Sequence, residues 1–413
     1  MRQRSVAIVG YGTAGQALAL LLGRAGWQVD VFEQAPRPGP VGAGFLLQPS
    51  GLQVLWQMGL LERVHAHGAM IERLHGTTPC GRTVMDIRYA DLDRRLYGLG
   101  LQRGALFQIL HRACAGLCRL HAGLRVVAVD AARGVLVDAQ GQQHGAYDLV
   151  VAADGASSQL RAQAGPARRD AAYPWGALWC LVPAADWPEA NVLAQRYVAA
   201  RKMVGMLPVG TRPDDDTPML SFFWSLPATG FDDWEASGMA AWQAALQDVW
   251  PACAQRLGGI TRCDQLARAS YRDAVVSAWS HQRLVLAGDS AHAMSPQLGQ
   301  GVNMALLDAW TLAGCLAFAP TQDQALADYA RQRRAHVSIY QFWSRWLTPL
   351  FQSDHDRMAA ARDLLFGPLG RVPGGRSHML RVLTGTQQGW LGKVALQAGF
   401  IDALQAQAGN RPA

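Results

Sequence analysis

Several features that mark other protein classes are missing from this chain of 413 residues. Its seven cysteines are scattered and form neither a CxxC pair nor a cysteine–histidine cluster with the spacing of a metal site. The cysteine pattern therefore predicts no metal centre. An odd number of cysteines without a disulfide framework fits a reducing compartment, so we expect a cytoplasmic protein.

Lysine is almost absent, since only Lys202 and Lys393 occur, although the net charge is +7. The positive charge comes from dispersed arginines that are not massed with aromatic residues, which argues against a nucleic-acid partner. No run of 18 uncharged apolar residues is present, so no transmembrane segment is predicted. The first predicted strand begins within five residues, which leaves no room for a signal peptide. Half of the residues are hydrophobic, enough for the packed cores of two or three domains.

What the chain does contain is three glycine-anchored segments. Each is an apolar run, typical of a strand buried in a parallel sheet, that ends in small or acidic residues. The three runs are Val6–Val9 before Gly10–Gly15, Leu149–Ala153 before Asp154-Gly155, and Leu284–Ala287 before Gly288-Asp289. Together they predict three walls of one dinucleotide site.

The first segment has the Gly10-x-Gly12-x-x-Gly15 spacing, with Thr13 and Ala14 between the last two glycines. Gly10 suits a tight turn, Gly12 lets backbone approach a pyrophosphate, and Gly15 lets a helix pack on the strand. The helix N-terminus would present N–H groups to the anion. Glu33 ends the next predicted strand, where a carboxylate can bind a ribose. This motif alone does not separate NAD from FAD.

The remaining periodicity predicts a mixed architecture. Helices are expected over 50–65, 103–122, 302–318 and 323–346, and an antiparallel pair over 124–138. Aromatic strands are expected over 175–182, 195–207 and 219–226, with an acidic turn at 213–216 between the last two. These aromatic strands predict an antiparallel sheet that is distinct from the dinucleotide-binding unit.

Taken together, the three segments resemble the FAD-dependent aromatic hydroxylase family, the single-component flavoprotein monooxygenases of the p-hydroxybenzoate hydroxylase group. The resemblance implies an α/β fold: a Rossmann-like FAD-binding domain, an inserted antiparallel-sheet substrate domain and a helical C-terminal region. We expect these to span 1–75 with 100–165 and 275–320, then 76–99 with 166–274, and finally 321–413.

The resemblance also assigns site residues. Asp154 and Gly155, with Arg161, would lie near the FAD pyrophosphate and the path of NAD(P)H. The alternative, that Asp154 is a loop carboxylate, is compatible with this role. Asp289 after Gly288 would bind the ribityl chain. A helix that starts after Gly299-Gln300-Gly301 would direct its N-terminus at the flavin, with three further residues beside the ring: Pro296, Val302 and Asn303.

Three other positions are predicted with an alternative beside each. Gly44, in the glycine loop over 41–45, lets backbone lie against a flat ring. Arg103, at a predicted helix start, matches a cofactor-contacting arginine of the family or is a surface arginine. His292 is a candidate proton-transfer residue, or it packs against its loop.

The implied activity is an FAD-dependent monooxygenase that uses NAD(P)H and O2 to hydroxylate a small aromatic or related apolar substrate through a flavin hydroperoxide. NAD(P)H would bind transiently, because no second dinucleotide motif occurs. Candidate substrate-pocket residues lie on the aromatic strands: Trp179, Tyr197, Met206, Phe222 and Trp224. The helical end could form a homodimer face. The alternatives are an epoxidase, a reductase, a non-catalytic flavin-binding protein and a halogenase, the last disfavoured because no lysine precedes Lys202.

Overall fold

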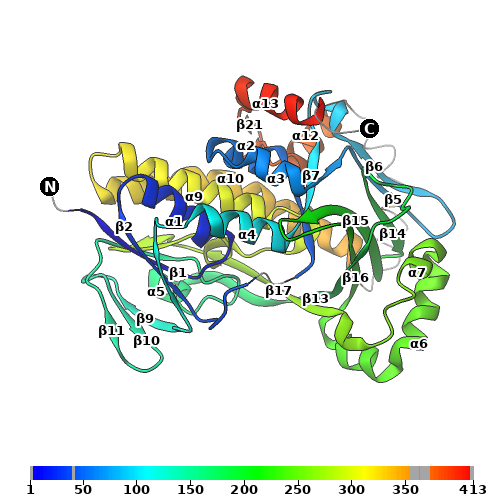
Figure 1. Ribbon diagram of the computed structural model, residues 1–413, viewed down its shortest axis with the longest axis horizontal. Helices are drawn as coiled ribbons and strands as arrows, with labels where there is room; N and C mark the ends of the chain where they lie inside the picture. The colour runs from blue at the N-terminus through cyan, green and yellow to red at the C-terminus, as the bar shows by residue number, and fades with distance from the viewer. Residues whose placement is uncertain (1–2, 40–41, 354–361, 363–372, 410–413) are drawn as a thin grey trace.

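A computed structural model describes residues 3–39, 42–353, 362 and 373–409. Val41, which opens the predicted glycine loop, and parts of the predicted C-terminal region lie outside these residues. The described chain forms two large sheets with helices between and around them (Figure 1).

The first sheet has six strands and is parallel except at one edge. In spatial order its strands are β18 (Ser280–His281), β19 (Leu284–Leu286), β12 (Leu149–Ala152), β1 (Ser5–Val9), β2 (Gln28–Glu33) and β8 (Arg119–Ala122). Every residue of β1, β12 and β19 is buried, as expected for strands covered on both faces. The three glycine-anchored segments therefore end side by side, at the carboxyl edge of adjacent strands.

Helices pack on this sheet and tie it to the rest of the molecule. α1 (Thr13–Arg24) and α10 (Gln322–Phe351) pack against α9 (Gly301–Phe318), and α4 (Arg103–Ala113) packs on α1. Within the described residues, α9 alone is long and apolar enough to cross a membrane. More than half of it is buried against neighbouring helices, and it carries the fully buried Asp308, so it is a core helix here.

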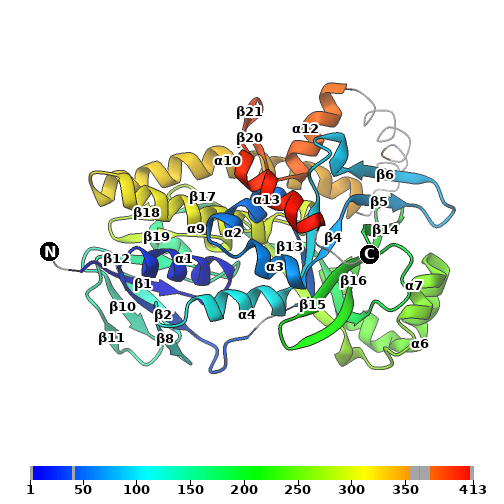
Figure 2. The same cartoon turned by 45° about the horizontal axis from the view of Figure 1, so that its top comes forward.

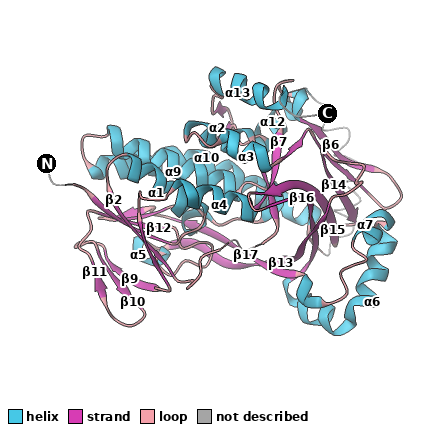
Figure 3. Cartoon of the chain, viewed as in Figure 1, coloured by secondary structure: helices cyan, strands magenta, loops and turns pink. Residues whose placement is uncertain are grey.

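The second large sheet has seven strands and forms the right side of the molecule in Figure 3. Its order is β17 (Ala267–Val276), β13 (Ala167–Pro183), β16 (Asp215–Pro227), β15 (Lys202–Arg212), β14 (Val192–Val198), β5 (Arg73–Thr77) and β6 (Thr83–Arg88). α6 (Phe231–Val249) and α7 (Pro251–Arg256) cover one face of this sheet. β5 joins this sheet before position 76, where the second predicted domain begins.

Smaller elements complete the fold. A three-stranded sheet holds β3 (Gly44–Leu47), β7 (Gly98–Gln102) and β4 (Ala69–Ile71), and another holds β11 (Gln143–His144), β10 (Val135–Asp138) and β9 (Val126–Asp130). The remaining helices of the first 300 residues are α2 (Pro49–Gln57), α3 (Leu61–His67), α5 (Arg161–Ala164) and α8 (Asp289–His292). After α10 come α12 (Pro373–Leu383), β20 (Gln387–Gln388), β21 (Gly392–Lys393) and α13 (Ala398–Gly409). Figure 2 shows α13 beside α2 and α3.

The mixed α/β fold predicted from the sequence is confirmed, with two local corrections. The helix predicted over 103–122 ends at Ala113, and Arg119–Ala122 is the edge strand β8, paired with β2. The strand predicted over 195–207 is a hairpin of β14 and β15 that turns between Val198 and Lys202. In the first case pairing with a distant strand overrides the local pattern. In the second a short turn divides what the pattern predicts as one strand.

Candidate active site

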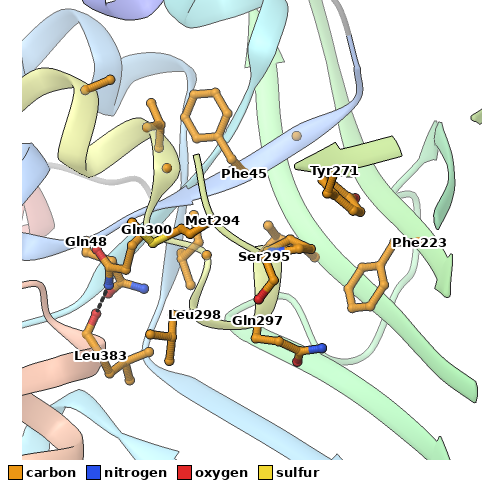
Figure 4. Close-up of a pocket in the computed structure, with 18 of the residues that line it drawn as sticks. Phe45, Gln48, Phe223, Tyr271, Met294, Ser295, Gln297, Leu298, Gln300 and Leu383 are labelled. Atoms are coloured by element: carbon orange, nitrogen blue, oxygen red, sulfur yellow. Dashed lines mark hydrogen bonds between the residues drawn. The ribbon is translucent and has the colours of Figure 1, made fainter. Parts of the chain in front are cut away.

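A cavity of about 1490 Å³ runs between the parallel sheet and the seven-stranded sheet. The glycine turn after β1 and Glu33 line one end, and strands β13 to β16 line the other. Figure 4 shows the loop Met294–Gln300 crossing the pocket, with Tyr271 and Phe223 on the sheet side and Gln48 and Leu383 on the opposite side. The volume exceeds the roughly 300–1000 Å³ of a single ligand pocket, so it has room for two molecules.

The glycine turn after β1 is built from three glycines with different surroundings. Gly10 has φ of +100°, and a Cβ there would lie 2.3 Å from the Ala153 carbonyl oxygen. At Gly15 a Cβ would lie 2.0 Å from the Gly10 carbonyl oxygen, so the absent side chain lets α1 pack on β1. At Gly12 a Cβ would meet no atom within 4 Å, and Gly12 lines the cavity. Only at Gly12 does the missing side chain leave space on the cavity side.

The N-terminus of α1 opens onto this space. No side chain caps the helix, and Thr13 and Ala14 line the cavity. The first N–H groups of a helix have no partner within the helix, so they are donors for an anion. Glu33 stands beside them, where its carboxylate accepts hydrogen bonds from the backbone N–H of Tyr11 and of Ala35, both at 2.8 Å.

Asp289, at the third glycine-anchored segment, lines the cavity and is accessible from it. Gly288 before it has φ of +67°, and a Cβ there would lie 3.1 Å from the Cβ of Ala14. Burial raises the pKa of the Asp289 carboxyl, against the opposing effects of His292 and Arg103. In the described part of the chain no group donates a hydrogen bond to this carboxylate, so its oxygens are available to a ligand.

The loop between α8 and α9 lies next to Asp289. Pro296, Gly299, Gly301 and Val302 all line the cavity, and Gly299 adopts a left-handed conformation with φ of +59°. α9 begins at Gly301 without a side-chain cap. Its first N–H groups therefore point back toward the loop and the cavity.

Asn303 has a different position from the one predicted. It is fully buried, its Oδ1 accepts from the backbone N–H of Gln48 at 2.9 Å, and its Nδ2 donates to the Leu46 carbonyl at 3.3 Å. It does not line the cavity but holds β3 and α2 against α9. The position of Asn303 in the sequence motif does not reveal whether its side chain points to a neighbouring segment of the protein or to a ligand.

The second glycine-anchored segment lines a smaller cavity of about 390 Å³ on the far side of the glycine turn, together with Glu33. Asp154 lies here: its Oδ2 accepts from the Gln159 N–H at 3.2 Å, its buried Oδ1 has no partner, and burial raises its pKa. Gly155 and Glu33 line both cavities. Arg161 lines neither; it donates to the backbone carbonyls of Ala156, Asp289 and Ser290, so it fastens this segment to the third one.

Arg103 and Gly44 lie on the wall formed by β3 and α4. Arg103 is the first residue of α4, lines the cavity, and holds its guanidinium 5.9 Å from the centre of the Phe45 ring. Gly44 also lines the cavity, and a Cβ there would lie 2.5 Å from the Val209 side chain. The structure thus brings both residues to the same space as Gly12 and Asp289.

His292 does not reach the cavity. It is buried, and its Nε2 lies 2.6 Å from Asp308 Oδ2. Asp308 also accepts from the Gly288 N–H at 2.7 Å and from Arg333 Nε at 2.6 Å. His292 is therefore part of a buried polar cluster that supports the Asp289 loop, in line with its alternative interpretation, and its proton-transfer role stays a prediction. Sequence reasoning missed Asp308, whose partners come from three separate elements.

The candidate substrate residues divide between the two faces of the seven-stranded sheet. Trp179 and Tyr197 line the cavity. The prediction is wrong for the other three, which lie in the hydrophobic core beneath α6: Met206, Phe222 and Trp224. The reason is the two-residue period of a strand, because neighbouring residues point to opposite faces.

The residues that replace them in the cavity wall lie on the same two strands or on β17. Phe223, directly opposite Trp179, and Met203, directly opposite Tyr197, share the cavity face. Tyr271 joins them, and its Oη accepts a hydrogen bond from Trp179 Nε1 at 3.0 Å. Strand registers would have identified these residues, but a single sequence does not supply registers.

Comparison with known proteins is consistent with this geometry. Residues 3–340 match the family model described as FAD binding domain. The chain is similar to 3-amino-4-hydroxybenzoate 2-monooxygenase of Streptomyces cremeus, with 29% identity over 88% of this chain and 93% of that protein. It is also similar to 3-amino-4-hydroxybenzoate 2-monooxygenase PtnB3 of Streptomyces platensis, with 31% identity over 80% of this chain and 84% of that protein.

A solved structure extends the likeness to the whole fold. A point variant of Klebsiella pneumoniae HpxO, complexed with FAD, superposes with a TM-score of 0.78, covers 94% of this chain and 100% of its own, and is 19% identical. At that identity the superposition establishes the fold, and the family follows from the sequence matches. The chain belongs to the FAD-binding-domain family and is an FAD-dependent aromatic monooxygenase.

Proposed function

We propose that the cavity holds FAD against the three glycine-anchored segments and an aromatic substrate against the seven-stranded sheet. NAD(P)H supplies two electrons as hydride, and the solvent supplies one proton. The two atoms of O2 then go to two different products. One oxygen atom enters the substrate as a hydroxyl group and the other leaves as water. The observation that carries the proposal is the pairing of open space at Gly12 with an unpartnered carboxylate at Asp289.

The residues present fit the cofactor. The N-terminus of α1 and the backbone at Gly12 would bind the pyrophosphate, because free N–H groups and a helix dipole both favour an anion. Asp289 would accept hydrogen bonds from ribityl hydroxyls, and Glu33 would accept them from the adenosine ribose. Arg103 would contact the cofactor from the β3 wall. Asp154 and Gly155 would lie on its pyrophosphate side and near the approach of NAD(P)H.

The reactive end of the cofactor would face the loop that contains Pro296. FAD supplies the electron transfer and the activation of O2 when it is bound. The chain supplies orientation and shelter: the N-terminus of α9 at Gly301 and Val302 would stabilise negative charge on the reduced ring, and the apolar sheet face would exclude water. Tyr271 would donate a hydrogen bond from its hydroxyl group to an oxygen or nitrogen of the substrate. Its O–H is available because Trp179 donates to the Tyr271 oxygen and does not accept from it.

Two single substitutions test the cofactor assignment. Gly12→Ala should leave the melting temperature of the flavin-free protein unchanged, because the methyl group meets no protein atom, yet weaken FAD binding at least tenfold. Asp289→Ala should cost roughly 1.5–3 kcal/mol of FAD binding, the usual loss for a charged hydrogen bond. Flavin fluorescence titration of the apoprotein gives both values.

Gly314→Ala is the matched control, since Gly314 on α9 has equal space for a methyl group and does not line the cavity. It should bind FAD like the unaltered protein. Full FAD affinity in both Gly12→Ala and Asp289→Ala would contradict the assignment. The activity itself is measured as NAD(P)H oxidation that accelerates when an aromatic compound is added and yields a hydroxylated product.

A further inference from the structure

We infer that the substrate is a neutral aromatic compound larger than one ring, and that its distal part binds among Trp343, Trp346, His378 and Trp390 at the far end of the cavity. We refer to these four residues as the aromatic rim. This inference rests on the proposed function and specifies the class of substrate.

The first argument is space. If FAD occupied as much as about 1000 Å³, the upper end of the range for one ligand, roughly 500 Å³ of the cavity would remain. An engineered cavity of about 150 Å³ is enough for one benzene ring. The compartment beyond the flavin is therefore several times larger than a single ring requires.

The second argument is where that extra space leads. The cavity is also lined by residues at the end of α10, on α12 and between β20 and β21, and these include all four residues of the aromatic rim. Trp346 and Trp390 are 55% and 58% exposed, which is unusual for tryptophan. Exposed apolar surface that is continuous with a binding cavity marks a place where a ligand is received.

The aromatic rim is also organised internally. Trp343 contacts three neighbours at ring-centre distances of 5.6 Å to His378, 5.7 Å to Trp346 and 6.3 Å to Trp390. His378 and Trp390 stack with an angle of 12° between their planes. The Trp343 indole N–H donates to His378 Nε2 at 3.0 Å. Apart from this stacked pair, the rings meet at angles of 53° to 89°, so the aromatic rim offers both ring faces and ring edges to another aromatic group.

The third argument is charge. Among the described residues that line the cavity, the arginines are Arg103, beside Phe45 at the cofactor end, and Arg376, which is ion-paired with Asp91. The other polar groups of the wall include the neutral side chains of Gln195 and Tyr271, together with the carboxylate of Asp86. Apart from Arg103, which the proposed function assigns to the cofactor, a carboxylate-bearing substrate would find no cation without an ion pair among these residues, and burying it unpaired is costly.

His378 completes the neutral surface. Indole is a donor only, so the Nε2 that accepts from Trp343 must be unprotonated and the imidazole carries its proton on Nδ1. Burial, and then Arg381, lower the pKa of His378, so it stays neutral at physiological pH. The aromatic rim therefore presents uncharged rings together with N–H donors from His378 and from its two exposed indoles, Trp346 and Trp390.

The experiment compares four probes on the FAD-loaded enzyme: phenol, 4-hydroxybenzoate, 2-naphthol and a 2-alkyl-4-hydroxyquinoline. Binding is followed by the change in flavin absorbance, and turnover by NAD(P)H oxidation. We expect the two larger neutral compounds to bind at least tenfold more tightly than 4-hydroxybenzoate and phenol. Trp346→Ala and Trp390→Ala should weaken the quinoline at least tenfold, with a much smaller change for phenol.

Phe318→Ala is the matched control, because Phe318 is 91% exposed at the end of α9 and does not line the cavity. Trp346→Phe should restore most of the affinity lost in Trp346→Ala. Tightest binding by 4-hydroxybenzoate or phenol, or equal losses for every probe in the rim variants, would overturn the inference while leaving the proposed monooxygenase intact. A protein that takes up no FAD, or oxidises NAD(P)H at the same rate with and without all four probes, would instead contradict the proposed function.

Discussion

At the scale of single residues, the hydrogen bond between Trp179 and Tyr271 shows how the sheet can orient a substrate. The two side chains come from β13 and β17, and both line the cavity. Because Trp179 uses one acceptor site of the Tyr271 oxygen, the hydroxyl proton is left to point elsewhere. Burial raises the pKa of Tyr271, so this proton stays in place at neutral pH.

Tyr271→Phe should therefore lower kcat/KM about tenfold to a hundredfold while the flavin content stays unchanged. The ring is kept, and only the donor to substrate and the acceptor for Trp179 are lost, each a hydrogen bond of about 1 kcal/mol or somewhat more. Steady-state kinetics with a turned-over aromatic, together with the flavin-to-protein absorbance ratio, provide the measurement.

Tyr173→Phe serves as the comparison variant for this change. Tyr173 also donates a buried hydroxyl hydrogen bond, to Thr348 Oγ1 at 2.7 Å, but does not line the cavity. If both variants lost the same activity, the Tyr271 hydroxyl would have only a structural role.

At the scale of elements, α9 illustrates how a helix predicted from its apolar composition acquires a task from its surroundings. The buried Asp308 on α9 joins three elements: the loop at Gly288, His292 on α8 and Arg333 on α10. Burial alone would raise its pKa, but His292 and Arg333 outweigh that effect and lower the pKa to about 2. The cluster holds Asp289 at the cavity from behind.

Asp308→Asn should destabilise the protein by roughly 3–5 kcal/mol, because it leaves the buried Arg333 without its counter-charge. The carboxyl is ionised more readily in the folded than in the unfolded chain. Its stabilising effect is therefore complete above the unfolded pKa near 4 and is lost as pH falls from about 4 to about 2. Urea denaturation at several pH values measures the difference between the two proteins.

That difference should shrink across this acid window. Asp233→Asn is the control, since Asp233 is exposed on α6, and it should change stability by no more than about 0.5 kcal/mol. A difference between Asp308→Asn and the unaltered protein that is the same at pH 6 and pH 3 would contradict the assigned charge state.

At the scale of the whole molecule, the cavity is assembled from segments that are distant in sequence. Gly12 and Glu33, Asp289 and Trp390 all line it, although they lie far apart along the chain. A ligand that spans the first two regions must bind the folded state alone, because the unfolded chain keeps them apart. Cofactor binding and global stability are thus linked. The homodimer predicted from the sequence stays a prediction, which sedimentation equilibrium would test.

FAD should raise the melting temperature by several degrees more than FMN does. At a concentration one hundred times Kd, a ligand stabilises the folded state by about 2.7 kcal/mol. FMN lacks the adenosine that would contact Glu33 and the second cavity, so at equal concentration it should reach a smaller occupancy. Differential scanning fluorimetry across a concentration series makes the comparison. Equal shifts in melting temperature for FAD and FMN would contradict the proposed contacts of the adenosine.

Prediction from the sequence succeeded where a feature depends on neighbours along the chain. The three strands that end in glycine, the helix after Gly12 and the turn at 213–216 were all identifiable, because strand burial and turn chemistry leave local patterns. The domain boundaries stay a prediction. The family assignment also follows from these local motifs, in their order along the chain.

Tertiary structure alone decided which side chains face the cavity. Phe222 and Phe223 are adjacent aromatic residues, yet one lies in the core and the other lines the cavity, because pairing with β13 sets the orientation of the whole strand. His292 stands in a signature loop but turns inward to Asp308, which lies on another helix. The sequence determined the fold and the cofactor class through short-range patterns. The wall of the substrate compartment depends on strand registers and helix packing between distant segments, which a single amino-acid sequence does not reveal.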